Sequence, residues 1–211
     1  MTEIRGEAPF LWRLSAREEE GSYSVAMVVP GPDDSKGFDL MIETGILRLA
    51  GDPELSENEE ILEWNQDDFD LFLRLLNQRK LGLGGGKPDT LRLDLTDPEV
   101  IDVIHIVAAA GFGFPWPPGS VLKESAGEFP RHKAEIGGLA SLNTIHGFKP
   151  CVVVDVAEEE VACVLLDNLE ASGGEGGEAL NRNDLLVVGH TDVLHPAFAQ
   201  PSARPASAVV H

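Results

Sequence analysis

Apolar and polar residues alternate in several short stretches of the first half of the chain, and each stretch predicts a strand. Residues 22–29 (SYSVAMVV) are also rich in β-branched side chains, which strands favour. Proline and glycine in residues 30–34 end this run, and apolar runs at 38–42 and 46–49 predict two further short strands. Residues 90–95 (TLRLDL) place three leucines on one face of a fourth strand.

Two stretches of the same half have the pattern of amphipathic helices. The first begins at Asn65, whose side chain can cap a helix, and ends before Gly82, since glycine favours the position after a helix. The second begins at residues 96–99 (TDPE), which have the pattern of a capping box with proline in the first turn, and ends at Gly111. The predicted apolar stripe of the first helix consists of Phe69, Phe72, Leu73, Leu76 and Lys80.

The pattern changes at residues 112–119 (FGFPWPPG). Three prolines and two glycines in eight residues do not fit a helix or a regular strand, so we place a joint between two domains here. Beyond the joint the pattern predicts strands at 151–156, at 161–166 and at 185–188, and it leaves open a continuation of the last strand to Val193.

The sequence therefore predicts an α+β protein. A mixed α/β domain occupies residues 1–111, the joint residues 112–119, and a β-rich domain, either a small barrel or a sandwich, residues 120–198. Residues 199–211 have no apolar pattern of their own and predict an extended C-terminal tail, and we expect extended arms at both termini.

Composition and charge narrow the classes of function. The 211 residues carry 16 Lys and Arg against 36 Asp and Glu, a net charge of −20 that both halves share. Such an acidic chain argues against a nucleic-acid binder and against docking on an anionic membrane, since both need basic residues. No run of about 18 apolar residues predicts a membrane span. The acidic N-terminus lacks the basic start of a signal peptide, so we expect a cytoplasmic location.

One glycine-rich segment invites a phosphate-binding interpretation. Residues 82–87 (GLGGGK) end in the glycine and lysine of a phosphate-binding loop, but Leu81 stands at the first glycine position and Pro88 follows the lysine. A strand rather than a helix comes next, so we expect a turn between helix and strand and no cofactor.

Histidines and cysteines are the other candidates for chemistry. His190 and Asp192 would share one face of a strand and could orient each other, but no third catalytic partner accompanies them in sequence. We expect His105 at the edge of a helix face, with general-base chemistry as its alternative. Cys151 and Cys163 lie in apolar strands, where a thiol behaves as a small apolar side chain rather than as a redox or metal group. We therefore predict no catalytic residue, no cofactor and no metal ligand.

The joint concentrates the aromatic residues. Phe112, Phe114 and Trp116 lie within five residues of one another, and large rigid side chains of this kind can anchor a protein partner. The alternative is that these side chains cover the seam between the two domains.

Residues 160–197 combine a short apolar strand, an acidic turn and a last strand with an apolar-glycine pattern. The residues that form this pattern are Val161, Val164, Leu165, Leu166, Asp167, Glu170, Ala171, Leu186, Val187, Val188, Gly189 and Val193. The segment resembles the C-terminal part of the head decoration proteins of tailed bacteriophages. That family shows a short apolar strand, an acidic turn with a glycine-rich loop and a strand that ends in an apolar-glycine pattern, and residues 1–118 have no counterpart in its small members.

The resemblance implies a structural protein without catalytic residues. Such a protein would form a trimeric clamp on the major capsid protein, on the outer surface of the virion, after synthesis in the host cytoplasm. Two alternatives stay open. One is an acidic accessory subunit of a cellular multiprotein complex, and the other is a hydrolase whose site combines scattered acids with His190 and Asp192.

Overall fold

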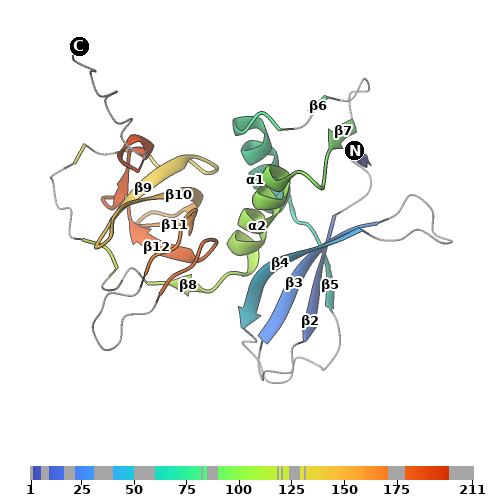
Figure 1. Cartoon of the computed structure of the whole chain (residues 1–211), viewed down its shortest axis with the longest axis horizontal. Coiled ribbons are helices and arrows are strands. Elements are labelled where there is room, and N and C mark those ends of the chain that lie inside the picture. Colours follow the sequence, from blue (N-terminus) through green and yellow to red (C-terminus); the bar gives the residue numbers. More distant parts are fainter. Residues whose placement is uncertain are drawn as a thin grey trace, which may run out of the picture. The chain divides into compact units, whose positions relative to one another are not determined.

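A computed structural model describes residues 2–5, 10–16, 22–30, 40–49, 60–81, 83–84, 90–117, 119, 121–123, 129–130, 132–170 and 179–199. The described residues form an α+β fold that is rich in strands and has two α-helices (Figure 1). The chain divides into two compact units. The first comprises Met1–Trp116 with Asn183–Leu186, and the second comprises Pro117–Arg182 with Val187–His211.

The first unit contains a four-stranded antiparallel sheet in the order β4-β3-β2-β5. Sequence analysis predicts two short strands where the structure has the single strand β4. Gly45 has a φ of +71°, which glycine adopts without strain, so the backbone can bulge here without ending the strand. The strands are β2 (Leu11–Ala16), β3 (Ser22–Val29), β4 (Leu40–Leu49) and β5 (Glu60–Glu63).

A second, three-stranded sheet of this unit has the order β1-β7-β6 and is also antiparallel. It contains the N-terminal residues, for which sequence analysis predicts an extended arm. That prediction is wrong for these residues, because their backbone pairs with β7 from Thr2↔Leu93 to Arg5↔Thr90. The strands are β1 (Thr2–Arg5), β6 (Leu83–Gly84) and β7 (Thr90–Leu93).

Helix α1 (Gln66–Gln78) begins at the predicted cap, Asn65, which forms a capping box with Asp68. Phe72 and Leu76 of the predicted stripe are buried, but Leu73 is 43% exposed, and Leu71 and Leu75 are buried instead. The buried face is centred about one residue earlier in the chain than the predicted stripe, so it includes the carboxylate of Asp68.

Helix α2 (Pro98–Phe112) is buried along most of its length and packs against α1 and β4. The predicted capping box is wrong at this helix. Asp97 is the N-cap and accepts a 2.9 Å hydrogen bond from the backbone N–H of Glu99, while the hydroxyl of Thr96 donates to Asp94. Both helices contact Trp12, so they lie on the same face of the four-stranded sheet.

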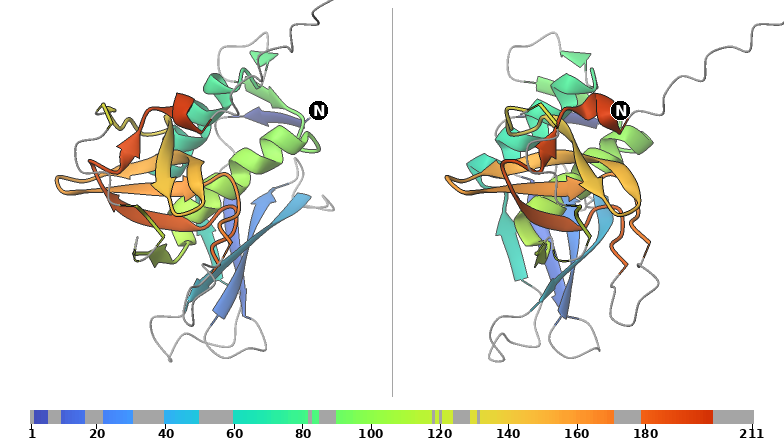
Figure 2. Two further views of the ribbon diagram at one scale, coloured as in Figure 1. Left: turned by 60° about the vertical axis from the view of Figure 1, so that its left-hand side comes forward. Right: turned by 90° about the vertical axis from the view of Figure 1, so that its left-hand side faces the viewer.

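The remaining strands form a sheet in the order β13-β9-β10-β11-β12-β8, in which β13 returns to pair with β9 (Figure 2). The predicted strand 151–156 lies within β10, and the predicted strand 161–166 corresponds to β11, which ends one residue earlier, at Leu165. The turn after Gly189 makes Val193 the start of a separate strand, and β8 pairs in parallel with Leu185 and Leu186 of β12. The elements are β8 (Pro115–Trp116), β9 (Leu139–Thr144), β10 (Gly147–Val156), β11 (Glu160–Leu165), β12 (Leu185–Gly189), β13 (Val193–Leu194) and the 3₁₀-helix η1 (Pro196–Phe198).

Candidate partner-binding surface

The three aromatic residues of the predicted joint have different surroundings in the structure. Phe112 is the last residue of α2 and is half-buried, with its ring centroid 5.4 Å from that of Trp12 at an interplanar angle of 82°. This edge-to-face contact makes Phe112 part of the packing of the first unit.

Phe114 and Trp116 form a pair beyond the helix. Their ring centroids are 4.9 Å apart at 73°, Phe114 is 44% exposed and Trp116 is half-buried. Trp116 is held by backbone pairing with Leu186 of β12, so its ring lies on a strand, and Phe114 comes directly before that strand. An exposed aromatic residue that a second ring supports has the geometry of an interface anchor.

Gly113 sets the direction in which the chain leaves α2 toward this pair. A Cβ at this position would lie 2.4 Å from the carbonyl oxygen of Ala109, which is closer than real side chains allow. The N–H of Gly113 also donates to that carbonyl at 2.9 Å and so closes the helix. A larger residue here would therefore move Phe114 away from its position beside Trp116.

A cluster of aromatic rings supports this part of the first unit from within. Trp12 and Trp64 stack at 4.8 Å, and Phe10 contacts both Trp64 and Phe72 edge to face. Asp68 adds a buried carboxylate, which accepts a 3.2 Å hydrogen bond from the indole N–H of Trp12. The rings and the carboxylate together tie β2, β5 and α1 into one core.

Burial raises the pKa of Asp68 above its ordinary value, because a charged carboxylate loses hydration among these rings. Its hydrogen bonds from the backbone N–H of Asn65 and from Trp12 oppose that rise. The bond from Trp12 is buried in the core and the bond from Asn65 closes the capping box, so Asp68 acts as a structural acceptor that fixes the start of α1.

The structure does not place His190 and Asp192 on one strand, because β12 ends at Gly189. A ring nitrogen of His190 (Nε2) lies 2.9 Å from the carbonyl oxygen of Ala157, and the Asp192 carboxylate accepts a 3.1 Å hydrogen bond from the N–H of Gly189. Each side chain therefore contacts backbone in a turn, and the predicted shared strand face is wrong.

His105 and His132 lie in separate units. His105 is half-buried on α2, as predicted, and its Nε2 is 3.3 Å from the carbonyl oxygen of Glu43 in β4. His132 is half-buried, with its ring centroid 5.2 Å from that of His195. His195 caps η1 by accepting from the N–H of Ala197.

Cys151 and Cys163 are fully buried, as predicted, and they lie next to each other on β10 and β11. The neighbouring thiol of Cys163 and burial together raise the pKa of the Cys151 thiol well above its ordinary value. Little thiolate is then present at neutral pH, and thiolate is the reactive form. The adjacency of the two thiols is a feature that their spacing in sequence does not reveal.

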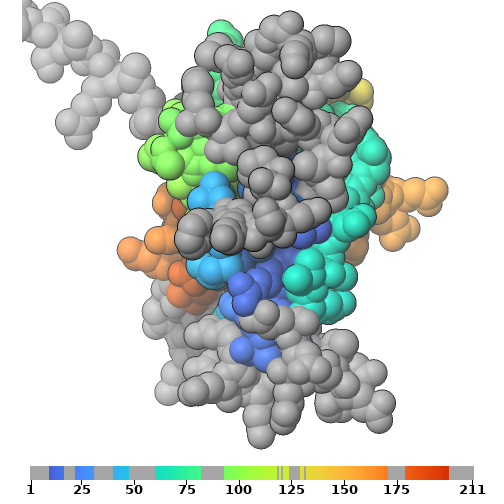
Figure 3. Space-filling model, turned by 90° about the vertical axis from the view of Figure 1, so that its right-hand side faces the viewer, coloured from blue at the N-terminus to red at the C-terminus, as the bar shows by residue number. Residues whose placement is uncertain are grey.

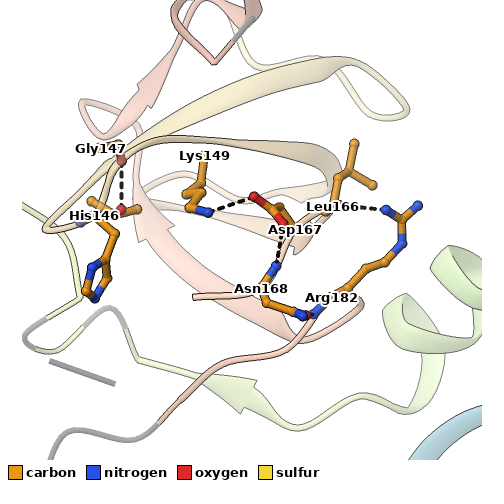
Figure 4. Close-up of polar contacts among 8 residues, drawn as sticks. His146, Gly147, Lys149, Leu166, Asp167, Asn168 and Arg182 are labelled. Carbon is orange, nitrogen blue, oxygen red and sulfur yellow. Dashed lines mark hydrogen bonds and ion pairs between the residues drawn. The ribbon is translucent and has the colours of Figure 1, made fainter. Parts of the chain in front are cut away.

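One polar cluster was not predicted at all. Lys149 of β10 donates a 2.7 Å hydrogen bond to Asp167, and Arg182 donates to the carbonyl oxygen of Leu166 at 2.7 Å (Figure 4). Asn168 accepts from the backbone N–H of Arg182. The ammonium group of Lys149 lowers the pKa of Asp167, whose side chain is 54% exposed. These contacts hold the segment after β11 against the segment before β12.

Among the described residues, no three His, Cys, Asp or Glu side chains come together as a metal site requires. Neither described helix has the length and apolar character needed to cross a membrane. No protein-family model matches the chain, and no curated protein matches it.

Proposed function

We propose that this chain is a non-catalytic structural protein that binds a larger protein assembly. The observation that supports the proposal is the pair formed by Phe114 and Trp116, an exposed aromatic side chain on a supported backbone. Aromatic anchors of this kind supply much of the binding energy of protein interfaces.

The assembly to test first is the outer surface of a bacteriophage capsid, which follows from the resemblance of residues 160–197 to head decoration proteins. In this proposal the second unit is a small barrel whose β13 strand returns to β9, and the bound form is a trimer on the major capsid protein. The segment 199–211, expected to be a tail, lies outside the described residues except for Ala199.

The test compares two variants that each remove a similarly exposed apolar side chain. Phe114 is 44% exposed beside Trp116, and Leu73 is 43% exposed on α1. We expect F114S to weaken binding to undecorated phage heads by about tenfold or more, and L73S to leave it unchanged. Co-sedimentation measures both, and circular dichroism checks that each variant is folded.

Equal binding by wild type, F114S and L73S would contradict the role of the aromatic pair. An acidic accessory subunit of a cellular complex is the outcome if wild-type protein does not bind heads but co-purifies from its source in a stable complex that F114S fails to enter.

A further inference from the structure

The four-stranded sheet of the first unit has a second face, opposite the helices. Trp12 and Met27 are cross-strand partners that point toward the helices, and each is at most 1% exposed. Because side chains alternate along a strand, their neighbours Leu11, Arg13 and Val28 point to the opposite face. We call this opposite side the outer face.

The residues of the outer face form two rows across the strands. The pairing places them side by side, since directly opposite residues share a face. From β4 to β5 the first row is Met41, Val28, Leu11 and Glu63, and the second is Glu43, Ala26, Arg13 and Ile61. Leu47 lies on the same face, opposite Ser24.

Three apolar side chains of the outer face are exposed to solvent. Ile61 is 62% exposed, Met41 45% and Leu47 39%. Figure 3 shows the described residues of these strands, in blue, light blue and teal, at the surface of this side of the first unit. A sheet with one face in water normally carries polar residues on that face. Exposed apolar side chains on it therefore indicate a surface that another protein segment covers.

The central strand gives the same indication. Residues 25–28 of β3 (VAMV) are all buried, which is typical of a strand covered on both faces. Arg13 accounts for part of that burial, because its side chain reaches across β3 until Nη1 lies 3.7 Å from the sulfur of Met41. The Arg13 side chain does not cover Ile61, which lies in β5 on the other side of β2 and stays exposed.

Charge selects the kind of partner. Glu43 and Glu63 stand at opposite ends of the two rows, and both are exposed. Residues 1–118 carry 23 acids against 10 bases, so a second copy of this chain would bring more negative charge to a negative surface. A basic polypeptide with apolar side chains complements the two acids at the ends and the exposed apolar side chains Ile61, Met41 and Leu47, and Arg13 is the one basic side chain in the two rows.

We propose that the outer face binds a basic protein segment, whose apolar side chains contact Ile61, Met41 and Leu47 while its lysines or arginines pair with Glu43 and Glu63. This inference deepens the proposed function and rests on it, since it assumes that the chain binds protein. It uses a surface that does not include Phe114.

The test measures binding of a fluorescent eight-residue peptide of alternating lysine and leucine to the full chain by anisotropy at 0.15 M salt. We expect I61S to weaken binding at least about fivefold, and the double change of Glu43 and Glu63 to Gln to weaken it and to flatten its salt dependence. L73S is the matched control and should bind as wild type does. Hydrogen exchange should show protection of β4 and β5 by the peptide.

A peptide that binds I61S and L73S equally well would overturn the inference, as would protection confined to elements other than the four strands. Wild-type protein that binds phage heads but not the peptide would also overturn it while leaving the proposed function intact. If I61S no longer binds the peptide but still binds phage heads as wild type does, the inference is supported and the heads bind another surface of the chain.

Discussion

Asp68 stabilises the start of α1 through its hydrogen bonds, but its ionised carboxylate loses hydration when it is buried. Its carboxylate accepts hydrogen bonds from Trp12 and from the backbone of Asn65, and it is 8% exposed. An amide oxygen could accept the same two bonds without a charge. The ionised form is therefore the costly one, and the stability of the protein should depend on pH at this residue.

We expect D68N to gain stability relative to wild type as pH rises. The native pKa of Asp68 is above the unfolded value of 3.8, so the native carboxyl still holds its proton where the unfolded one has lost it. Its stabilisation is thus complete below pH 3.8 and is lost as pH rises through the native pKa. Urea unfolding of both proteins from about pH 3 to pH 7 measures the difference.

A difference between D68N and wild type that does not change with pH would contradict this account. D68A is the control, because it removes both hydrogen bonds. It should be less stable than D68N by about 1–3 kcal/mol at neutral pH, since the buried indole N–H of Trp12 and the backbone N–H of Asn65 both lose their acceptor.

At the scale of elements, two residues are candidates for the N-cap of α2, and their variants can be told apart by stability. The structure gives the capping role to Asp97, whereas the capping-box pattern gives it to Thr96. We expect D97A to lower the free energy of unfolding by about 1 kcal/mol, because the N–H of Glu99 loses its acceptor. T96A should cost clearly less, since its hydroxyl bonds an exposed carboxylate. Thermal or urea unfolding that ranks the two variants in the opposite order would contradict the assignment.

Local patterns predict an element where its own residues decide its conformation. Strands 151–156 and 161–166 are continuous apolar runs, and the cap of α1 at Asn65 depends on its own side chain and that of Asp68. The predicted stripe of α1 is confirmed at Phe72 and Leu76 and wrong at Leu73, because the position of the buried face depends on what packs against the helix. Leu73 is apolar, but nothing in the helix itself shows that Leu71 rather than Leu73 meets the core.

Strand β9 was missed for a related reason. Ser141 and Thr144 are fully buried, and their polar side chains weaken the apolar pattern of the strand. The hydroxyl of Ser141 donates to the carbonyl oxygen of Pro196, and that of Thr144 donates to the carbonyl oxygen of Gly147. The Ser141 partner is 55 residues away along the chain, so sequence alone could not show that this hydroxyl is satisfied inside the protein.

The candidate surfaces were predictable to different degrees. The aromatic residues of the proline-rich segment are conspicuous in the sequence, but the support of Phe114 by Trp116 is a feature of the fold. The outer face could not be found from sequence, because its rows join residues of four strands. The sequence predicts two short strands in place of β4 and does not predict β2 or β5. The pairing of Arg13 with Ile61 therefore could not be inferred without the structure.

At the scale of the whole molecule, the division into units is not a single cut. Asn183–Leu186 belong with the first unit, so the chain passes from one unit to the other more than once. The parallel pairing of Pro115 with Leu185 explains the assignment, because it joins residues from late in the sequence to strand β8 of the first unit. A composition change at one joint cannot reveal such a return.

The net charge of −20 bears on partners at this scale. Both halves are acidic, so two copies repel each other over long distances unless apolar contacts or basic partners compensate. Association with a basic protein surface should be fast at low salt and should weaken as salt screens the charges.

The most direct test of the account is a titration of undecorated phage heads with purified protein, followed by sedimentation and quantification of the bound chain. The account predicts saturable binding with a fixed number of chains per capsid site, and a multiple of three where the trimer is the bound form. Absence of binding, with the protein remaining monomeric at high concentration and joining no other complex, would contradict the claim that this chain acts by binding a protein assembly.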